Sequence, residues 1–406
     1  MKAVFQVFSF DVVSKVVLGL MAMALIRYMP GAEYAEYTFA VSVVSVATGT
    51  LSSAFNRVYI VGYGRLGLGN EVTPFFGFQL LAIGAVAAAA YPFAGRTGGL
   101  FWFMALVVLS QCSSEFAKTI FQRELKFIRF SMVEFARSLL FAGGIVALVI
   151  WVGHRMEAWQ ALVVQALAGF LVFPAVAGRM DLRRLFDVQT AVRLSRQIFA
   201  GDYRYLFGYF FVLAFFSQID VFMLKTLGTG HMVATYGTAF RYYNMVLLAL
   251  AAVHTVLLPM VQNAGSAEEL DGVYRKSWRL LGVFAPCVLL GAWAAQWIMP
   301  AIDMGKYPGA VTVFRVLSVS AIASFAFSPY VNLVMRFEAF RFLLLLVCAA
   351  AVASVALNAL LIPRFHETGA ALATLGSFLF VNGAIYIKAR GLRARLSGAA
   401  GVGAGA

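Results

Sequence analysis

Two residues of opposite charge lie inside consecutive hydrophobic segments of the chain, Asp220 in one and Arg241 in the next. Asp220 lies about six residues before the end of its segment and Arg241 about seven residues after the start of the next, which at about 1.5 Å per helical residue places both about 9–11 Å from the same end. An ionised side chain in hydrocarbon costs at least about 2.5–3.5 kcal/mol, so each should face a partner or a hydrated cavity. Either the two form an ion pair, or they meet an ionic substrate.

These two interpretations assign different chemistry to the charges. In the first, an ion pair locks two neighbouring helices together. In the second, the planar guanidinium of Arg241 binds a phosphate oxygen, and Asp220 holds that guanidinium until substrate or a proton arrives. Asn244 follows Arg241 by three residues and therefore lies on the same helix face. Spacing alone leaves both interpretations open.

The first hydrophobic segment carries a second group of charges near its start. Asp11, Ser14 and Lys15 are spaced i, i+3 and i+4, so they share one face of a helix. Lys15 can extend its ammonium group to lipid headgroups, or it can contact a phosphate in a cavity. Arg57 follows Asn56 at the end of the second segment and would add a cationic contact at the same mouth.

Three further charges favour a structural role. Glu115, Glu134 and Arg137 are expected at similar depth on the fourth and fifth segments, and Glu134 and Arg137 are spaced i, i+3. We therefore interpret them as a structural ion network, with a coupling role as the alternative. Arg315, in the tenth segment, has no acid at its depth except Asp303 just outside, and it ranks lower as a cavity residue.

The segments that must position these charges are membrane spans. The chain has 406 residues, 62% hydrophobic and 12% charged, whereas soluble domains are about 45–50% apolar. Apolar windows of about 20 residues match the thickness of a bilayer. They predict an all-α polytopic membrane protein with twelve transmembrane helices, at residues 8–28, 35–56, 74–94, 100–120, 131–152, 157–177, 204–226, 234–262, 277–298, 309–335, 340–362 and 367–388.

Basic residues predict the orientation of these spans. Of the 32 Lys and Arg residues, 22 lie in the connections or span ends on the side of the N-terminus, 6 in those on the other side, and four deep within spans. Because positive residues favour the cytoplasmic side, both termini are predicted to be cytoplasmic. The predicted organisation is an N-terminal six-helix bundle (1–177), a basic cytoplasmic linker (178–203), a C-terminal six-helix bundle (204–390) and a disordered tail (391–406). The linker carries Arg183, Arg184, Arg193 and Arg196, which predict an amphipathic helix at anionic lipid headgroups.

The two halves of the chain share a local pattern. Arg27 and Tyr37 correspond to Lys225 and Tyr236, each pair flanking a short Gly-containing turn. Because each half would contain an even number of spans, the halves must share one orientation. This is a transporter-like plan, with a site expected where the halves meet.

Motifs of soluble enzymes are missing from the sequence. It contains no phosphate-binding loop, no His-Glu-x-x-His and no Ser nucleophile elbow. Cys112, Cys287 and Cys348 lie in apolar runs without metal-ligand spacing. The sequence thus predicts no enzyme, no metal and no cofactor. Because the basic residues follow the spans instead of gathering on one soluble segment, it also argues against nucleic acid as a partner.

Four stretches carry a resemblance to a known family. They are RYMPGAEYAEYTFAVS, FQRELKFIRFSMVEFARSLL, IDVFMLKTLGTGHMVATYGTAFR and LNALLIPRFHETGAALAT. Over nearly its whole length the chain resembles the polysaccharide (Wzx-type) flippases of the multidrug, oligosaccharidyl-lipid and polysaccharide (MOP) superfamily. The resemblance implies two parallel-related six-helix bundles around a central cavity, lined mainly by spans one, two, seven and eight. It also implies alternating access that carries undecaprenyl-pyrophosphate-linked oligosaccharide repeat units from the inner to the outer leaflet of the bacterial cytoplasmic membrane.

The same resemblance implies a role in the assembly of O-antigen, capsule or exopolysaccharide. Its partners would be the lipid-linked glycan, membrane lipids, a polysaccharide polymerase and chain-length machinery. The driving force would be a proton or sodium gradient, or the substrate gradient itself. The alternative is a multidrug exporter of the same superfamily, which should bind organic cations through acids and aromatic residues. The basic residues within the spans favour the anionic cargo. A membrane-embedded glycosyltransferase would show a large outer loop, whereas the outer connections here are short.

Overall fold

The computed structural model describes residues 2–402 apart from 64–65, 69–70, 98, 175–179, 201–202, 265 and 338–339, and within this part it is helical with no strand. Every predicted span overlaps a helix, which confirms the all-α polytopic class. Six of the described helices are long and apolar enough to cross a bilayer, and a broken pair, Tyr203–Phe216 with Ile219–Leu227, would be a seventh. One of the six, Arg341–Arg393, is long enough to contain two predicted spans.

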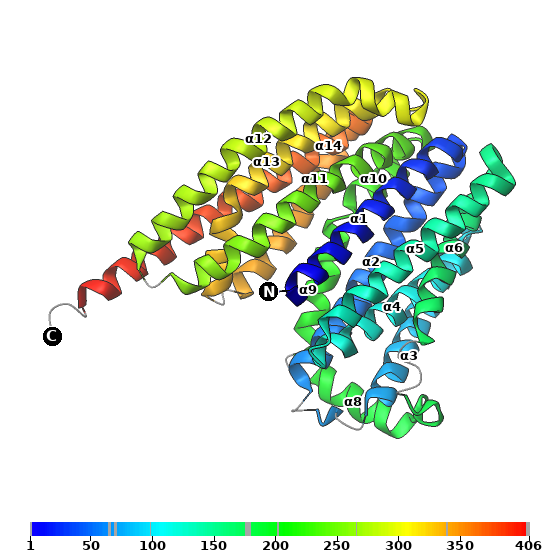
Figure 1. Ribbon diagram of the computed structural model, residues 1–406, viewed down its shortest axis with the longest axis horizontal. Helices are drawn as coiled ribbons and strands as arrows, with labels where there is room; N and C mark the ends of the chain where they lie inside the picture. The colour runs from blue at the N-terminus through cyan, green and yellow to red at the C-terminus, as the bar shows by residue number, and fades with distance from the viewer. Residues whose placement is uncertain are drawn as a thin grey trace. The chain divides into compact units, whose positions relative to one another are not determined.

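The chain forms two compact units, Met1–Gln218 and Ile219–Ala406. The first contains α1 (Lys2–Tyr28), α2 (Gly31–Gly62), α3 (Val72–Ala90), η2 (Tyr91–Thr97), α4 (Phe101–Arg123), α5 (Phe127–Val152), η3 (Gly153–Arg155), α6 (Ala158–Val172), η4 (Leu182–Arg184), α8 (Val188–Ala200) and α9 (Tyr203–Phe216). Helix α1 packs on α5, and α4 packs on both α2 and α6 (Figure 1). Aromatic rings fill the contact between α3 and α4, where Phe76 stacks on Phe116 with ring centroids 4.9 Å apart.

The boundary between the units differs from the one that the sequence predicts. The expected break is the linker 178–203, but α8 and α9 both belong to the first unit. Helix α9 packs along α2, where a Cβ atom on Gly49 would lie 3.0 Å from the Cβ of Ala214. The first half of the seventh predicted span therefore stays with the N-terminal helices. The span is broken at Ser217 and Gln218, and α10 (Ile219–Leu227) begins the second unit.

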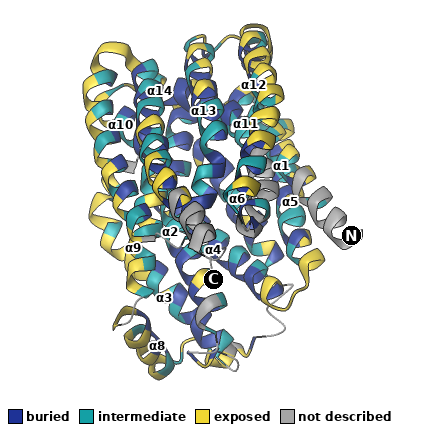
Figure 2. Ribbon diagram, turned by 90° about the vertical axis from the view of Figure 1, so that its left-hand side faces the viewer, coloured by how far each residue is buried: buried dark blue, intermediate teal, exposed yellow. Residues whose placement is uncertain are grey.

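The basic linker is docked on α3. The backbone amide of Asp181 donates to Thr73 Oγ1 at 3.2 Å, and the carbonyl of Leu185 lies so close to Gly77 that a side chain at this glycine would clash. Helix α8 lies beside α3 at one end of the unit (Figures 1 and 2). Its buried face consists of Ala191, Leu194 and Ile198. The predicted amphipathic helix is confirmed, and its attraction to anionic headgroups stays a prediction.

The second unit contains α10, α11 (Gly230–Asn263), α12 (Ala267–Asp303), α13 (Gly309–Arg336) and α14 (Phe340–Val402). Helix α13 packs on α11, α12 and α14, while α10 packs on α14 (Figure 1). The rings of Phe284 on α12 and Phe325 on α13 stack with centroids 4.6 Å apart. At its C-terminal end α14 continues as helix to Val402, where the sequence predicts disorder from residue 391, and 403–406 lie outside the described residues.

Helix α14 is two limbs joined at a sharp break. His366 has φ 54° and ψ −135° inside this helix, and the backbone of Gly369 approaches Leu361 too closely for any side chain at the glycine. The limbs are antiparallel, because Leu346 of the first and Ile385 of the second belong to one core cluster. The eleventh and twelfth predicted spans correspond to these two limbs.

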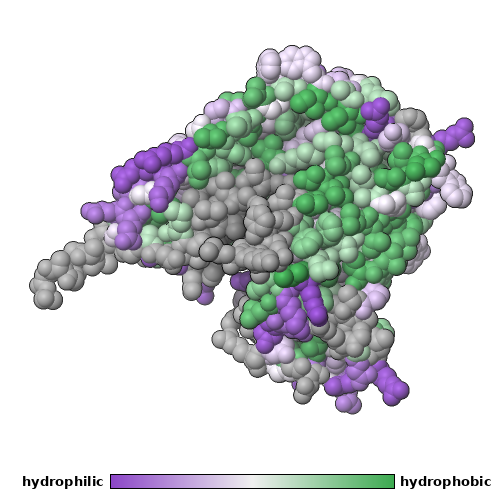
Figure 3. Space-filling model, viewed as in Figure 1, coloured by the Kyte–Doolittle hydropathy of each residue, from purple (hydrophilic) through white to green (hydrophobic). Residues whose placement is uncertain are grey.

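The outward surfaces are apolar where a bilayer would contact them. Helices α5 and α6 expose Leu139, Leu140, Val146, Ile150, Trp151, Trp159, Leu167 and Leu171, and α12 exposes Val283, Leu289, Leu290, Trp293 and Trp297. Figure 3 shows extensive hydrophobic surface, with hydrophilic residues gathered towards the ends of the helices. Soluble monomers rarely expose contiguous apolar patches of this kind. The chain is a multi-pass membrane protein.

Candidate functional site

Asp220 lies in the first turn of α10 and is buried inside the second unit. Its Oδ2 accepts hydrogen bonds from the hydroxyl of Tyr236 at 2.6 Å and from the hydroxyl of Thr374 at 2.5 Å. Its Oδ1 accepts from Nδ2 of Asn358 at 2.8 Å. The carboxylate is therefore surrounded by neutral donors from α11 and from both limbs of α14.

Two breaks in the helices bring these groups together. The interruption at Ser217 and Gln218 starts α10 just before Asp220, and the free amides of a helix N-terminus favour a carboxylate in the first turn. The break at His366 folds α14 back on itself, so that Asn358 on one limb and Thr374 on the other reach the same carboxylate. A straight helix through His366 would place Asn358 and Thr374 about 24 Å apart, too far to share one carboxylate.

The group keeps spare acceptor atoms. Oδ1 of Asn358 is buried and has no partner in the described part of the chain, while Nδ2 of the same side chain also donates to the carbonyl of Ser354 at 2.9 Å. The hydroxyl of Thr374 also lies 3.1 Å from the carbonyl of Ala370. One carboxylate among amide, hydroxyl and carbonyl oxygens suits a proton or a hard monovalent cation. Among the described residues, no group of three His, Cys, Asp or Glu side chains is placed to hold a metal ion.

Of the two alternatives for Asp220 and Arg241, the structure does not show the ion pair. The three donors above are the side-chain partners of Asp220 in the described residues, and Arg241 is not one of them. Tyr236 on α11 faces Asp220, and Arg241 follows it by five residues. Because five residues of helix correspond to a rotation of about 140°, Arg241 points in another direction from α11 even though its depth matches that of Asp220. Arg241 and Asn244 are both half-buried, and Arg241 has interactions of its own. The assignment of both to phosphate binding stays a prediction.

Sequence reasoning found the acid of this site and missed its donors. Tyr236, Asn358 and Thr374 are uncharged, and they lie 16, 138 and 154 residues from Asp220. A signal was nevertheless present. All four residues fall within two of the stretches that carry the family resemblance, IDVFMLKTLGTGHMVATYGTAFR and LNALLIPRFHETGAALAT.

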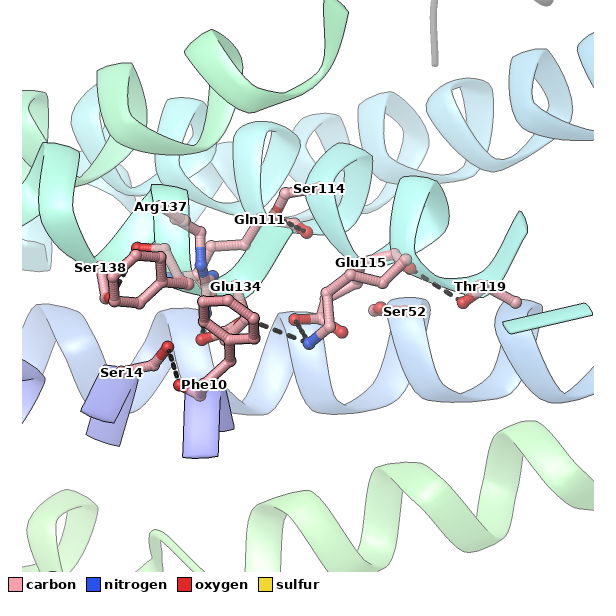
Figure 4. A network of polar contacts seen from close by, with 12 residues as sticks. Phe10, Ser14, Ser52, Gln111, Ser114, Glu115, Thr119, Glu134, Arg137 and Ser138 are labelled. Carbon is pink, nitrogen blue, oxygen red and sulfur yellow. Dashed lines mark hydrogen bonds and ion pairs between the residues drawn. The ribbon is translucent and has the colours of Figure 1, made fainter. Parts of the chain in front are cut away.

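The first unit contains a second buried group of charges, on α4 and α5. Nζ of Lys118 lies 3.0 Å from Glu115 Oε1 and 3.1 Å from Glu134 Oε2, and Nη2 of Arg137 lies 2.6 Å from Glu134 Oε1. Figure 4 shows Glu115, Glu134 and Arg137 close together, with side chains of several serines around them. The expected contact between Glu134 and Arg137 is confirmed. Two acids and two bases make this ion network neutral, and its role, structural or coupling, stays an interpretation.

The remaining predicted residues have different surroundings. Lys15 is half-buried on α1 with interactions of its own, and Arg57 is exposed near the end of α2. Arg315 donates from Nε to the carbonyl of Ala292 at 3.1 Å and from Nη2 to Gln296 at 3.2 Å, so its guanidinium is held against α12. These bonds give Arg315 a helix-packing role that the sequence did not indicate. The side chain of Asp11 lies outside the described residues.

Comparisons with known proteins add the fold relatives of this chain. No family model and no curated protein sequence matches it. Among solved structures, the lipid II flippase MurJ in an inward closed conformation is similar at a TM-score of 0.75 and 12% identity, over 95% of this chain and 87% of that one.

Multidrug transporters are similar as well. An inward-facing MATE family transporter of the MOP superfamily matches at a TM-score of 0.70 and 13% identity, over 94% of this chain and 95% of that chain. A mutant of the Vibrio cholerae MATE transporter VcmN matches at 0.58 and 13% identity, over 96% of both chains. These relatives are transporters and flippases, not enzymes, and this chain shares their two-lobed fold of twelve transmembrane helices.

Proposed function

We propose that the protein is a flippase that moves undecaprenyl-pyrophosphate-linked oligosaccharide repeat units from the inner to the outer leaflet of the bacterial cytoplasmic membrane. Similarity to a lipid II flippase over 95% of the chain supports this proposal. The two lobes would open alternately to the two sides of the membrane. The product would be used to assemble O-antigen, capsule or exopolysaccharide.

The observation that carries the choice of an anionic cargo is the state of the acids in the spans. A transporter of organic cations would hold its cargo with accessible carboxylates. Here Glu115 and Glu134 are neutralised by Lys118 and Arg137, and Asp220 is covered by three donors. The chain has a net charge of +14. Surplus positive charge fits a pyrophosphate, which binds well to Arg and Lys side chains.

Several modest cationic contacts suit a cargo that must leave water and return to it. The candidates for contact with the pyrophosphate are Lys15, Arg57 and Arg241, with Asn244 as a neutral donor beside Arg241. Asp11 stays a candidate neighbour of Lys15. A single tight site would hold the pyrophosphate instead of releasing it, so spreading the positive charge favours turnover.

We assign the coupling step to Asp220. Its carboxylate carries one negative charge without a basic partner, and the binding of one proton or one sodium ion would neutralise it. Tyr236, Asn358 and Thr374 come from different helical segments, so a change at the carboxylate acts on α11 and on both limbs of α14 together. A gradient of the bound ion across the membrane would then bias the transport cycle.

The proposed orientation places both termini in the cytoplasm. The excess of basic residues on the side of the N-terminus supports it. On this orientation the flippase delivers repeat units to the outer leaflet, where a polysaccharide polymerase and its chain-length machinery would receive them. No soluble cofactor is required, because the ion gradient or the substrate gradient supplies the driving force.

Deleting the gene in a strain that makes a surface glycan tests this function. The proposal predicts that lipid-linked repeat units accumulate on the cytoplasmic leaflet and that surface glycan is lost. Continued export of glycan without accumulation contradicts it. If the deletion leaves glycan unchanged but sensitises cells to cationic drugs, the multidrug exporter is the correct function, an alternative that the MATE-like fold keeps open.

A further inference from the structure

Buried polar side chains without hydrogen-bond partners form a row in the second unit. On α13 the row consists of Ser320, Ser324, Ser328 and Asn332; Ser377 and Asn382 on the second limb of α14 and Tyr243 on α11 complete it. We call this set of seven residues the polar seam. All of them except the half-buried Ser324 are at most 5% exposed. Within the described part of the chain none of the seven polar atoms concerned has a partner.

Contacts at two levels fix the register between α13 and the second limb of α14. Near the start of both segments, Gly309 lies against Glu367. Further along, the rings of Phe327 and Tyr386 pack with centroids 6.1 Å apart. The two segments therefore run in the same direction, and residues whose numbers differ by 58 or 59 lie at the same depth.

This register places the seam directly beyond the Asp220 site. Thr374, which donates to Asp220, lies about one helical turn before Ser320. Ser377 and Asn382 of α14 lie close to the levels of the first two serines of α13, but five residues of helix turn their side chains about 140° apart, so at most one of them shares a face with these serines. From there the seam continues along α13 for two further turns, about 12 Å, to Asn332. Arg336 follows one turn later, at the end of α13.

Tyr243 connects the seam to the site from a third helix. It lies seven residues after Tyr236 on α11, so the two side chains share one face, two turns apart. The hydroxyl of Tyr236 is bonded to Asp220, whereas the hydroxyl of Tyr243 is buried without a partner among the described residues. Tyr243 therefore lies about 10 Å along α11 from the tyrosine that contacts the carboxylate, on the same helix face.

Some hydroxyl groups of the helices do have a partner, although those of Thr235 and Thr238 on α11, outside the seam, have none among the described residues. Ser318 on α13 donates to the carbonyl of Phe314 at 2.8 Å, and Thr48 on α2 donates to that of Val44 at 2.7 Å. Buried polar groups that have no protein partner are normally bonded to ordered water. Side chains one turn apart lie about 5–6 Å from each other, a separation that one water spans with two hydrogen bonds of about 2.8 Å.

We infer that the polar seam is a hydrated path between Asp220 and the Arg336 end of the second unit, along which a proton or small cation moves. The inference rests on the proposed coupling role of Asp220 and adds the route and the end of the unit at which it opens. At that end Nη1 of Arg336 donates to the carbonyls of Val261 and Ala264, at 3.0 and 2.7 Å. These carbonyls near the C-terminus of α11 offset its positive charge.

The reactivity of cysteines introduced into the polar seam tests whether the seam is hydrated. The variants are Ser324→Cys and Ser328→Cys, and the matched control is Ser318→Cys, which replaces a buried hydroxyl of the same helix outside the seam. The full-length protein in nanodiscs is treated with a small charged methanethiosulfonate reagent. Labelling at each position is followed by peptide mass spectrometry, so the three native cysteines can stay. Gel filtration confirms that each variant is folded.

The reagent attacks the thiolate, which forms only where water can stabilise the charge, so the inference predicts that both seam cysteines react at least about tenfold faster than the control. A smaller ratio overturns it. The result is independent of the proposed coupling. If Asp220→Asn abolishes ion-dependent transport while the seam cysteines react as slowly as the control, the coupling stands and the path is refuted. If the seam cysteines react fast while Asp220→Asn transports normally, the path is wet and the coupling role fails.

Discussion

The two buried charged groups of this protein differ in how their charge is balanced. In the first unit, Glu115 and Glu134 are paired with Lys118 and Arg137 at 2.6–3.1 Å. In the second unit, the described partners of Asp220 are all neutral, at 2.5–2.8 Å. The charges of the first group balance one another, whereas the carboxyl of Asp220 has only neutral partners among the described residues, and the proposed coupling would use it to bind a proton or a cation.

We therefore expect the ion network of the first unit to contribute to stability, and Asp220 in the second unit to contribute to the proposed coupling. A self-neutralised network in a membrane has no electrostatic need for an ion, and removing one member leaves an unpaired buried charge. A lone carboxylate with hydrogen-bond donors tolerates both the charged and the neutral state. The two units should therefore respond in opposite ways when their acids are replaced by amides.

Replacing Asp220 by Asn should have the largest effect on transport. The amide has nearly the same shape but cannot carry the charge that binds a cation, so ion-dependent export should fall by at least about tenfold, equivalent to about 1.4 kcal/mol. Export is measured as surface glycan per cell and as flipping in proteoliposomes under an imposed gradient. Asp220→Glu is the matched control and should retain part of the rate. Equal rates for the Asn variant and the unmodified protein would refute the coupling role.

Replacing Glu134 by Gln should have the largest effect on stability. It leaves Lys118 and Arg137 with one remaining acid, and breaking a buried ion pair costs about 3–5 kcal/mol. The readout is the midpoint of thermal unfolding in mild detergent. The double variant Lys118→Met with Glu134→Gln restores neutrality and should recover part of the loss. An unchanged midpoint in the single variant would show that the network contributes little.

Replacing Thr374 by Val should weaken the Asp220 site without removing its charge. The change removes one of three hydrogen bonds to the carboxylate, and a hydrogen bond to a charged group contributes about 1.5–3 kcal/mol. We expect the concentration of the coupling ion needed for half-maximal transport to change by about tenfold or more. Thr374→Ser, which keeps the hydroxyl, should behave like the unmodified protein. Identical behaviour of the Val and Ser variants would exclude a contribution of this hydroxyl.

Replacing Glu115 by Gln should have the smallest effect of the four. Its side chain is 32% exposed and is paired with Lys118, which Glu134 also contacts. Partly exposed ion pairs contribute at most about 1 kcal/mol. Thermal unfolding should therefore shift much less than in the Glu134 variant. A shift as large as that of Glu134→Gln would mean that the two acids act as one unit.

The sequence predicts the membrane spans well because each span has a strong apolar signal of its own. The fold prediction fails where contacts between helices, and not the hydropathy of one segment, determine the structure. The break at Ser217 and Gln218 leaves the apolar run intact, so it gives no hydropathy signal, and it moves the boundary between the units from the linker to residue 218. Similarly, Gly77 and Leu185 dock the linker on α3 through a close approach that no periodicity reveals.

The candidate site could be predicted in part. Charge alone singles out Asp220, because an acid in an apolar run is rare, but depth says nothing about direction around a helix. Arg241, one of the two alternatives considered for Asp220, is not among its described partners. Asn358, 138 residues away, could not be found by local spacing. Lys118 was missed because it lies near the end of its predicted span, 100–120. In the structure α4 continues to Arg123, which keeps Lys118 inside the ion network.

Unfolding of the purified protein as a function of sodium concentration and of pH tests the central claim most directly. A ligand that binds only the folded state stabilises it by about 2.7 kcal/mol at roughly a hundred times its dissociation constant. With ionic strength held constant by choline, the unfolding midpoint of the unmodified protein and of Glu115→Gln should rise with sodium or with added protons. The midpoint of Asp220→Asn should not respond. An Asp220→Asn protein whose midpoint rises as much as that of the unmodified protein would contradict the account.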